Sequence, residues 1–277
     1  GSPKSGQSLE EVGKLILEQI ELVKRGEFPD WMVSAIINDL KMRELRSFES
    51  NSSRVSTMLN SFVMNMPYEF VANRLERLSR ITKDDIVRFA RENYGDNYVI
   101  VYKRTGVDNS VSKVEKPSIT PIEVNRVAQS DFVKKIFDTQ VPDIEPVFLK
   151  YDKDVHLFML DKKVPVYYIQ NVENDIFNLY YIADMGNNND RRLGLALNYL
   201  RYLGTSKYSP SEIQMEFYKL GCSFFISASD DQVYVSLTGL TGNFAQGLEL
   251  FEHLLADAQP NEEALQNLIA DVLKQRN

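Results

Sequence analysis

The spacing of apolar residues changes twice along the chain, and this change limits the fold more than any other feature of the sequence. In the first 105 residues apolar side chains recur at the spacing of helices, as between Leu9 and Val23. The stretch 106–150 has no sustained period, and its prolines favour extended backbone. From residue 151 onward short β-forming runs alternate with helical stretches. We therefore expect a mostly helical domain at 1–105, an interdomain linker at 106–150 and an α+β domain at 151–277.

Helix starts and strands of this last part are encoded locally. Ser209 and Glu212 have the spacing of a capping box, as Ser8 and Glu11 do near the N-terminus, so that each pair satisfies amides at a helix start. Runs rich in β-branched and aromatic residues predict strands at 155–160, 164–170, 176–185, 222–228 and 232–238. Their order among the expected helices predicts the α+β class, with helices packed on one face of a largely antiparallel sheet.

The first part contains five expected helices but a single strand-like run, from Tyr98 to Tyr102. A lone strand cannot form a sheet. We therefore expect the first domain to be incomplete and the chain to be an interior piece of a longer protein. Residues 98–102 are then expected to pair with another segment, either a missing domain of the same protein or a second copy in a homo-oligomer.

Charge and the number of metal-binding side chains exclude several classes of function. The 277 residues include two histidines and one cysteine, too few for a three-histidine or a cysteine-based zinc site. With 32 basic against 39 acidic residues, the net charge of −7 gives no electrostatic footprint for nucleic acid. No apolar run approaches the ~20 residues of a membrane helix. We expect neither a nucleic-acid partner nor a membrane span.

The individual candidates for chemistry have simple structural interpretations. His156 lies in an expected strand, where a surface or cross-strand role is the first interpretation and a functional titrating group the alternative. His253 lies on an amphipathic helix without a second histidine four residues away, so the helix offers no two-ligand face. Cys222 is expected to be a buried small hydrophobe. No strong catalytic signature is present.

Clusters of like residues leave two interpretations open. The acidic pairs are expected at helix starts and turns, and the run Asn187–Asp190 is expected to form a turn and a helix cap rather than a calcium loop. The aromatic residues of the expected strands are Tyr167, Tyr168, Phe177, Tyr180, Tyr181, Phe224, Phe225 and Tyr234. Sheet packing explains such a cluster, and the alternative is a surface that binds an extended peptide.

Two stretches carry a resemblance to a known family. Residues 194–205 read GLALNYLRYLGT, and a capped helix ending in Leu220-Gly221 follows them. This run resembles the zinc-motif region of the insulinase-type, pitrilysin-like metallopeptidases, in which G-L-A-H-x-x-E-H precedes Gly-Thr. Residues 46–54, 81–86 and 94–98 are similar to the C-terminal part of the second domain of that family.

The resemblance implies an architecture and an activity for a parent protein. Members of the family have four similar α+β domains, of the mitochondrial-processing-peptidase type, in two halves that close around a peptide chamber. On this basis the chain holds the end of the second domain, the linker between the halves and most of a third, inactive domain. Zinc is expected in the parent, bound upstream of residue 1, and peptide substrates and the missing domains are the expected partners.

The metal positions of the motif are replaced in this sequence. The two histidine positions hold Leu197 and Arg201, and the glutamate position holds Leu200. Leucine cannot ligate a metal, and arginine adds a positive charge where a dication would sit. In the last ten residues Asp271 is the one carboxylate that could replace the third ligand. We therefore assign no catalytic, cofactor-binding or metal-binding residue, and we expect Leu197 and Leu200 to be core residues.

The sequence thus predicts a non-catalytic interior region of a zinc-dependent peptidase, forming its hinge and the wall of its peptide chamber. The alternative is a scaffold or partner subunit of the same family that supports an active peptidase. An H-x-x-E-H motif upstream of residue 1 in the parent would distinguish these two. A third interpretation is an unrelated α+β interaction module. Gly1-Ser2-Pro3 resembles a remnant of cloning, so the compartment stays open, with the cell envelope or periplasm compatible with the resemblance.

Overall fold

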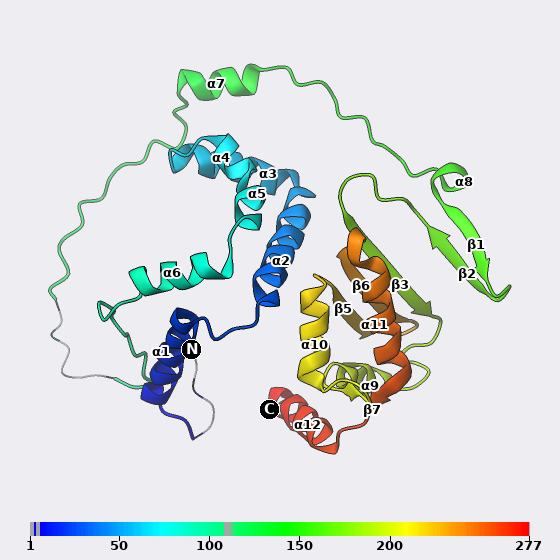
Figure 1. The fold of residues 1–277 in the computed structure, drawn as a ribbon. Helices are drawn as coiled ribbons and strands as arrows, with labels where there is room; N and C mark the ends of the chain where they lie inside the picture. Colours follow the sequence, from blue (N-terminus) through cyan, green and yellow to red (C-terminus); the bar gives the residue numbers. More distant parts are fainter. Residues whose placement is uncertain (1–2, 4–5, 108–111, 113, 277) are drawn as a thin grey trace. The chain divides into compact units, whose positions relative to one another are not determined.

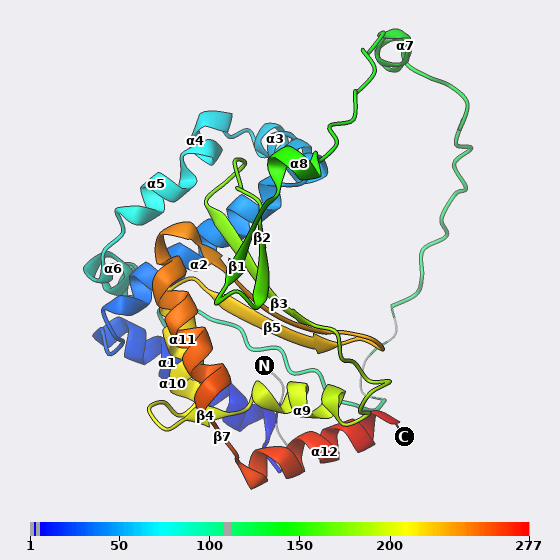
Figure 2. The same ribbon diagram turned by 90° about the vertical axis from the view of Figure 1, so that its right-hand side faces the viewer.

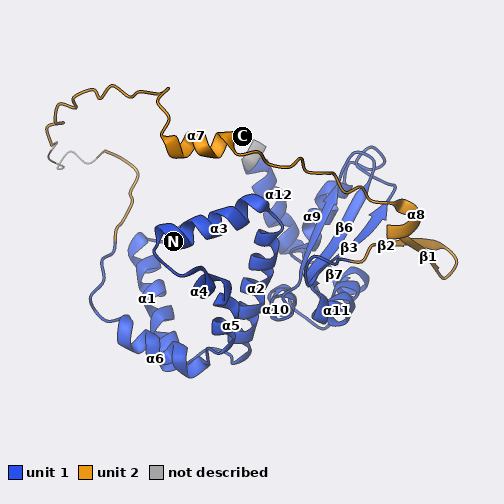
Figure 3. Ribbon diagram, turned by 90° about the horizontal axis from the view of Figure 1, so that it is seen from above, with its two compact units in different colours: residues 1–100, 171–277 blue, residues 101–170 orange. Residues whose placement is uncertain are grey.

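The computed structural model describes residue 3, residues 6–107, residue 112 and residues 114–276; Gly1 and Ser2 of the cloning-like remnant lie outside these residues. The chain forms two compact units (Figure 3). Residues 1–100 and 171–277 make up the first unit, and residues 101–170 make up the second. The assignment of 1–105, 106–150 and 151–277 to consecutive domains stays a prediction.

Helices make up most of the chain between Leu9 and Asn93, as predicted (Figure 1). The helices are α1 (Leu9–Arg25), α2 (Trp31–Phe48), α3 (Asn51–Val63), α4 (Tyr68–Ala72), α5 (Arg74–Ser79) and α6 (Lys83–Asn93). The capping box of Ser8 and Glu11 is present at the start of α1. Helix α1 lies against α6, and the Arg91 side chain of α6 donates a 2.7 Å hydrogen bond to the carbonyl oxygen of Lys24.

The strand predicted from Tyr98 to Tyr102 is not formed. These residues have no regular secondary structure, because no described strand pairs with them and unpaired backbone cannot make a ladder. Their side chains are exposed, with Val99 and Val101 nearly nine-tenths so. The apolar run that predicted the strand is therefore present, whereas its hydrogen-bonding partner is not found among the described residues.

The C-terminal part of the first unit is a three-stranded antiparallel sheet in the order β3-β6-β5. Its strands are β3 (Ile176–Ala183), β5 (Ser223–Ala228) and β6 (Val233–Leu240). A separate short pair joins β4 (Gly204–Thr205) to β7 (Ala258–Gln259). The accompanying helices are α9 (Leu193–Leu200), α10 (Pro210–Lys219), α11 (Phe244–Asp257) and α12 (Glu262–Arg276), with a 3-10 turn, η1 (Thr241–Asn243). This arrangement confirms the predicted α+β class.

One face of the sheet carries the core. Leu237 of β6 is opposite Leu179 of β3 and Phe224 of β5, so these three side chains share a face. Helices α10 and α11 cover that face, and Phe251 and Leu254 of α11 have no exposed surface. The remaining buried members of this cluster are Ile213, Phe217, Cys222 and Leu250. The helical layer therefore holds the sheet from one side.

Helix α2 connects the helical segment to this sheet within the first unit. Its Asn38 side chain donates a 3.2 Å hydrogen bond to the carbonyl oxygen of Lys219, at the end of α10. Met42 packs with Ile176 and Leu240, where β3 begins and β6 ends. Both contacts join segments more than 130 positions apart, so local sequence patterns do not predict them.

The second unit contains short elements joined by irregular chain. They are α7 (Asp131–Asp138), α8 (Tyr151–Asp154), β1 (His156–Leu160) and β2 (Val164–Tyr168). Strands β1 and β2 lie within the strands predicted at 155–160 and 164–170, and they form an antiparallel hairpin. Three residues, 161–163, connect the strands; Asp161 and Lys162 have positive φ angles of 47° and 56°, and the Lys163 amide donates a 2.9 Å hydrogen bond to the carbonyl oxygen of Leu160 that closes the turn. No helix in the described part of either unit is long and apolar enough to cross a membrane.

Candidate functional site

The segment that resembles a zinc motif forms helix α9, which lies against strand β5 (Figure 2). Arg201 follows the last residue of the helix, and its Nη2 donates a 3.1 Å hydrogen bond to the carbonyl oxygen of Ile226 in β5. Its guanidinium carbon lies 5.1 Å from the centre of the Phe225 ring. The position equivalent to the second histidine is therefore held on the edge strand of the sheet by one hydrogen bond and one cation–π contact.

The other two positions of the motif are less buried than predicted. Leu197 and Leu200 are half-buried, and no residue of α9 is fully buried. Leu200 packs against the core cluster, whereas Leu197 is not among the residues of that cluster. The prediction that both are core residues was therefore only partly right. Helix α9 lies against the edge strand β5 and is not enclosed by other elements, so its side chains keep part of their surface exposed. Across the described residues, no three histidine, cysteine or acidic side chains come together as a metal site would require.

His253 belongs to a polar cluster that the sequence did not reveal. Its Nε2 lies 3.0 Å from the hydroxyl of Thr205 and 3.8 Å from a carboxylate oxygen of Asp257. The same carboxylate oxygen accepts hydrogen bonds from the backbone amide and the hydroxyl of Ser206. Both hydrogen bonds lower the pKa of Asp257, and the bond from the Ser206 hydroxyl has the larger effect. The cluster ties the loop after β4 to the last turn of α11.

The cluster does not have the geometry of a catalytic triad. In a triad the hydroxyl and the carboxylate bind opposite nitrogens of the imidazole. Here Thr205 and Asp257 both approach Nε2 of His253, and the Ser206 hydroxyl donates to the carboxylate instead of to the imidazole. Beside the cluster lies an open hollow of about 250 Å³, lined by Gly204–Pro210 and Gln259–Asn261. This arrangement supports a structural role for His253.

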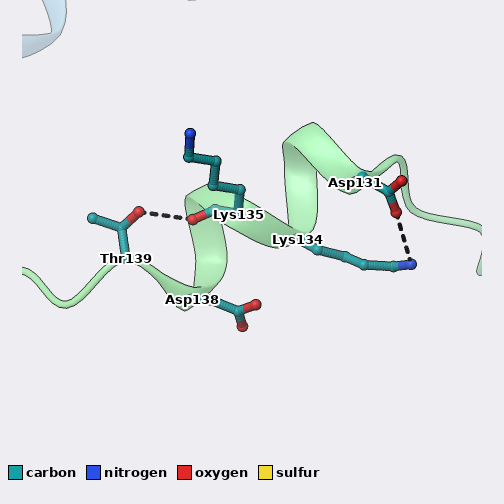
Figure 4. Close-up of a pocket in the computed structure, with 5 residues that line it drawn as sticks. All are labelled: Asp131, Lys134, Lys135, Asp138 and Thr139. Atoms are coloured by element: carbon teal, nitrogen blue, oxygen red, sulfur yellow. Dashed lines mark hydrogen bonds and ion pairs between the residues drawn. The ribbon is translucent and has the colours of Figure 1, made fainter.

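In the second unit, a hollow of about 420 Å³ runs along one face of α7 (Figure 4). Asp131, Lys134, Lys135, Asp138 and Thr139 line it. Asp131 and Lys134 form an ion pair at 3.3 Å, and the Thr139 hydroxyl donates to the carbonyl oxygen of Lys135. All five residues belong to one exposed helix and the residue after it, so the hollow has no opposite wall that could enclose a ligand.

Most of the remaining candidates have the structural roles that the sequence predicted. The predicted helix cap within Asn187–Asp190 was wrong, because α9 begins at Leu193 and its N-cap residue, Arg192, has no side-chain cap hydrogen bond. Cys222 is buried, and burial raises the pKa of its thiol to about 11, so it is not a reactive thiolate. His156 is exposed in β1, opposite Tyr168 of β2. The side-chain oxygen of Asn187 accepts a hydrogen bond from the amide of Gly194, in the first turn of α9, and that of Asn189 accepts one from the amide of Gly186. These oxygens shape the turn before α9.

The acidic pairs have the predicted positions too. Asp84-Asp85 and Glu262-Glu263 lie in the first turns of α6 and α12, and Asp230-Asp231 lies between β5 and β6. Helix starts favour negative charge because the unpaired amides there carry partial positive charge.

The aromatic residues of the strands divide between two faces of the sheet. Tyr181 and Phe224 lie on the face covered by α10 and α11, where the Tyr181 ring stacks on Phe251. The Tyr181 hydroxyl donates to Glu252, and burial with this contact raises its pKa to about 12. Tyr180 and Phe225 lie on the opposite face and are 57% and 56% exposed. Sheet packing therefore explains the first two residues but not the second two.

The fold is an antiparallel α+β layer in which helix α9 carries Leu197 and Leu200 and is followed directly by Arg201. No family model matches the chain, and no curated protein sequence matches it.

Among solved structures, it is similar to a peptidase M16 inactive domain from Pseudomonas fluorescens, with 22% identity over 44% of this chain and 31% of that chain, at a TM-score of 0.40. A protease from Helicobacter pylori shows 16% identity over 44% of this chain and 30% of that one, at a TM-score of 0.39. The periplasmic protease PqqL from Escherichia coli shows 13% identity, with 93% of this chain and 32% of that chain covered, at a TM-score of 0.40. The chain spans about a third of the length of each of these structures.

Proposed function

We propose that the chain is a non-catalytic region of a peptidase-like protein and that its sheet forms part of a surface for peptide substrates. The observation that carries this proposal is the state of the motif helix. The motif segment resembles a zinc helix in sequence, but its ligand and glutamate positions hold Leu197 and Leu200 in α9 and Arg201 directly after it. The Arg201 side chain is bonded to β5, so a cation of the protein itself lies beside the strand.

In this proposal the catalytic zinc belongs to another part of the parent protein. The parent would cleave peptides with a metal-activated water, and this chain would contribute the hinge between two halves and a silent wall of the chamber. The stretch 106–150, with its spread prolines, has the composition of a hinge segment. The exposed Tyr180 and Phe225 support a wall that contacts peptide.

The test is made on the 277-residue chain. After dialysis against a chelator and then zinc, metal analysis should give no stoichiometric zinc, and a quenched-fluorescence peptide library should not be cleaved. The variant Leu197→His/Arg201→His serves as a positive control, because imidazoles at i and i+4 on one helix face form a two-ligand zinc site. One tightly bound zinc per wild-type chain, or peptide cleavage that a chelator abolishes, would contradict a non-catalytic role.

A further inference from the structure

Two exposed aromatic rings flank a small residue on the face of the sheet away from α10 and α11. At one end of that face Met42 of α2 packs on Ile176 and Leu240, four positions from the row described here. Tyr180 of β3 is opposite Ser236 of β6, and Ser236 is opposite Phe225 of β5. The three side chains therefore form one row across the sheet, on the face away from α10 and α11. More than half of each ring is exposed, whereas Ser236 between them is 9% exposed. The small side chain of Ser236 therefore leaves space between the two larger, exposed rings.

The spacing of this row suits a single inserted side chain. Neighbouring strands lie about 4.8 Å apart, so the strands that carry the two rings are separated by roughly 10 Å. An apolar side chain placed over Ser236 would contact both Tyr180 and Phe225 at van der Waals distance. In the adjacent row Ile182 is 57% exposed, beside Tyr234. An extended chain that crosses the face would therefore meet apolar surface beyond the first anchor.

A positive charge lies at one end of the row. The Arg201 guanidinium is over the Phe225 ring, and its one hydrogen bond to Ile226 leaves other donors of the fork available. The described residues include no ion pair of Arg201. A guanidinium beside an exposed ring binds carboxylates through paired hydrogen bonds, while the ring is contacted by apolar groups. The net charge of −7 opposes acidic ligands over the chain as a whole, so the preference for a carboxylate at this place rests on Arg201.

We propose that this open sheet face binds an extended peptide segment through an apolar side chain over Ser236, between Tyr180 and Phe225, and a neighbouring carboxylate on Arg201. The inference rests on the proposed function, because it names the substrate class for the same sheet. The peptide would be bound by the face of the sheet, through side chains of β3, β5 and β6 and through the residue that follows α9. The ligand is therefore an acidic and apolar peptide, and a basic peptide should be disfavoured.

Fluorescence anisotropy of the full chain with labelled ten-residue peptides tests the proposal. The probe peptide consists of glycine and serine around one leucine flanked by two glutamates, and the matched peptides carry lysine for glutamate or alanine for leucine. We expect the probe to bind at least about tenfold more tightly than either matched peptide at low salt, which corresponds to about 1.4 kcal/mol. Arg201→Gln should remove the preference for glutamate over lysine. Phe225→Ala and Tyr180→Ala should remove the preference for leucine over alanine.

Matched substitutions control for general effects. Arg191→Gln removes an exposed arginine ten positions away, and Phe89→Ala removes a ring of equal exposure on α6; neither should change peptide affinity. Thermal unfolding of each variant monitors the fold. Peptide binding that ignores charge and survives Phe225→Ala would overturn this inference but leave the proposed function standing. Absence of binding to every peptide would contradict both. A change in sedimentation of the protein alone on Phe225→Ala would assign the face to a second copy instead.

Discussion

The sulfur atom of Cys222 occupies the space in which a side chain at Gly247 would lie. A Cβ atom built on Gly247 would be 2.8 Å from Cys222 Sγ and 3.7 Å from its Cβ. Gly247 is an interior residue of α11. The same built Cβ atom would also lie 3.7 Å from Cδ2 of Leu237 in the sheet. Because glycine has no side chain, α11 can pack on the sheet at a distance that leaves room for the Cys222 thiol.

Gly247→Ala should therefore destabilise the fold, and Cys222→Ala should relieve the effect. Overpacking of a core costs about 1–3 kcal/mol, against a gain of about 1 kcal/mol for alanine over glycine in a helix. In the Cys222→Ala background the sulfur is absent, so Gly247→Ala should become neutral or stabilising. Urea unfolding of the four proteins gives the coupling free energy, which we expect to exceed about 1 kcal/mol.

Gly239 provides the control for this cycle. A Cβ at Gly239 would also meet Cys222 Sγ, but it would lie 2.9 Å from the Phe177 ring as well. Cys222→Ala should therefore leave most of the cost of Gly239→Ala in place. Equal relief at both glycines would mean that the thiol acts through a general loosening of the core, and the specific contact would be disproved.

Arg201 should also contribute to stability and solubility. Its hydrogen bond to Ile226 and its contact with Phe225 are each worth about 1 kcal/mol or less at an exposed site. Arg201→Leu should lower the free energy of unfolding by about that amount and leave a carbonyl of the edge strand less protected. Light scattering during heating should then rise earlier than for wild type. Arg201→Lys, which keeps a charge on the edge, should aggregate less than Arg201→Leu; the reverse order would refute the role assigned to the charge.

Local signals predicted much of the fold, whereas contacts between distant segments were missed. The capping boxes at Ser8 and Ser209 and the hairpin turn at Asp161 depend on a few neighbouring residues, and all are present. Asp30 is a residue type that favours a helix start, yet its side chain does not cap α2. Its carboxylate instead pairs with Lys83, 53 positions away. The pairing of β4 with β7 was missed too, because strands of two residues have no apolar periodicity that the sequence could show.

In the candidate site, too, local features could be predicted and contacts between distant segments could not. Residue types alone carry the prediction that Leu197, Leu200 and Arg201 form no zinc site, because neither leucine nor arginine is a zinc ligand. The two faces of the aromatic cluster depend on strand register, which places Tyr180 and Tyr181 on opposite sides. Alternation along a strand contains this signal, but which side the helices cover is decided by tertiary packing. The cluster of Thr205 with His253 could not be predicted, because β4 and α11 are far apart in sequence.

Acid should weaken the link between the β4 loop and α11. Hydrogen bonds from Ser206 lower the pKa of Asp257 in the folded state below the unfolded value of about 3.9. A lowered folded pKa gives stabilisation that is present above the unfolded pKa and is lost as the pH falls through the folded pKa. Ser206→Ala should raise the pKa of Asp257, and its destabilising effect should be larger at pH 7 than in acid.

Carbon-13 titration of the Asp257 carboxyl group, together with urea unfolding at several pH values, measures both effects. Ser227→Ala is the control, because Ser227 has no carboxylate partner among the described residues. A destabilisation by Ser206→Ala that stays constant down to the acid limit would show that the hydroxyl acts through packing rather than through the charge of Asp257.

We propose that residues 98–102 pair with the same segment of a second copy. All five residues are apolar or aromatic, and Val99 and Val101 are 89% and 87% exposed. Charged side chains on an exposed strand oppose such pairing. Val99→Lys/Val101→Lys should therefore shift a concentration series in sedimentation velocity toward monomer. Val114→Lys/Val127→Lys changes two valines of equal exposure outside the segment and should leave self-association unchanged. Wild-type protein that stays monomeric at every concentration, with rapid amide exchange at 98–102, would contradict this pairing.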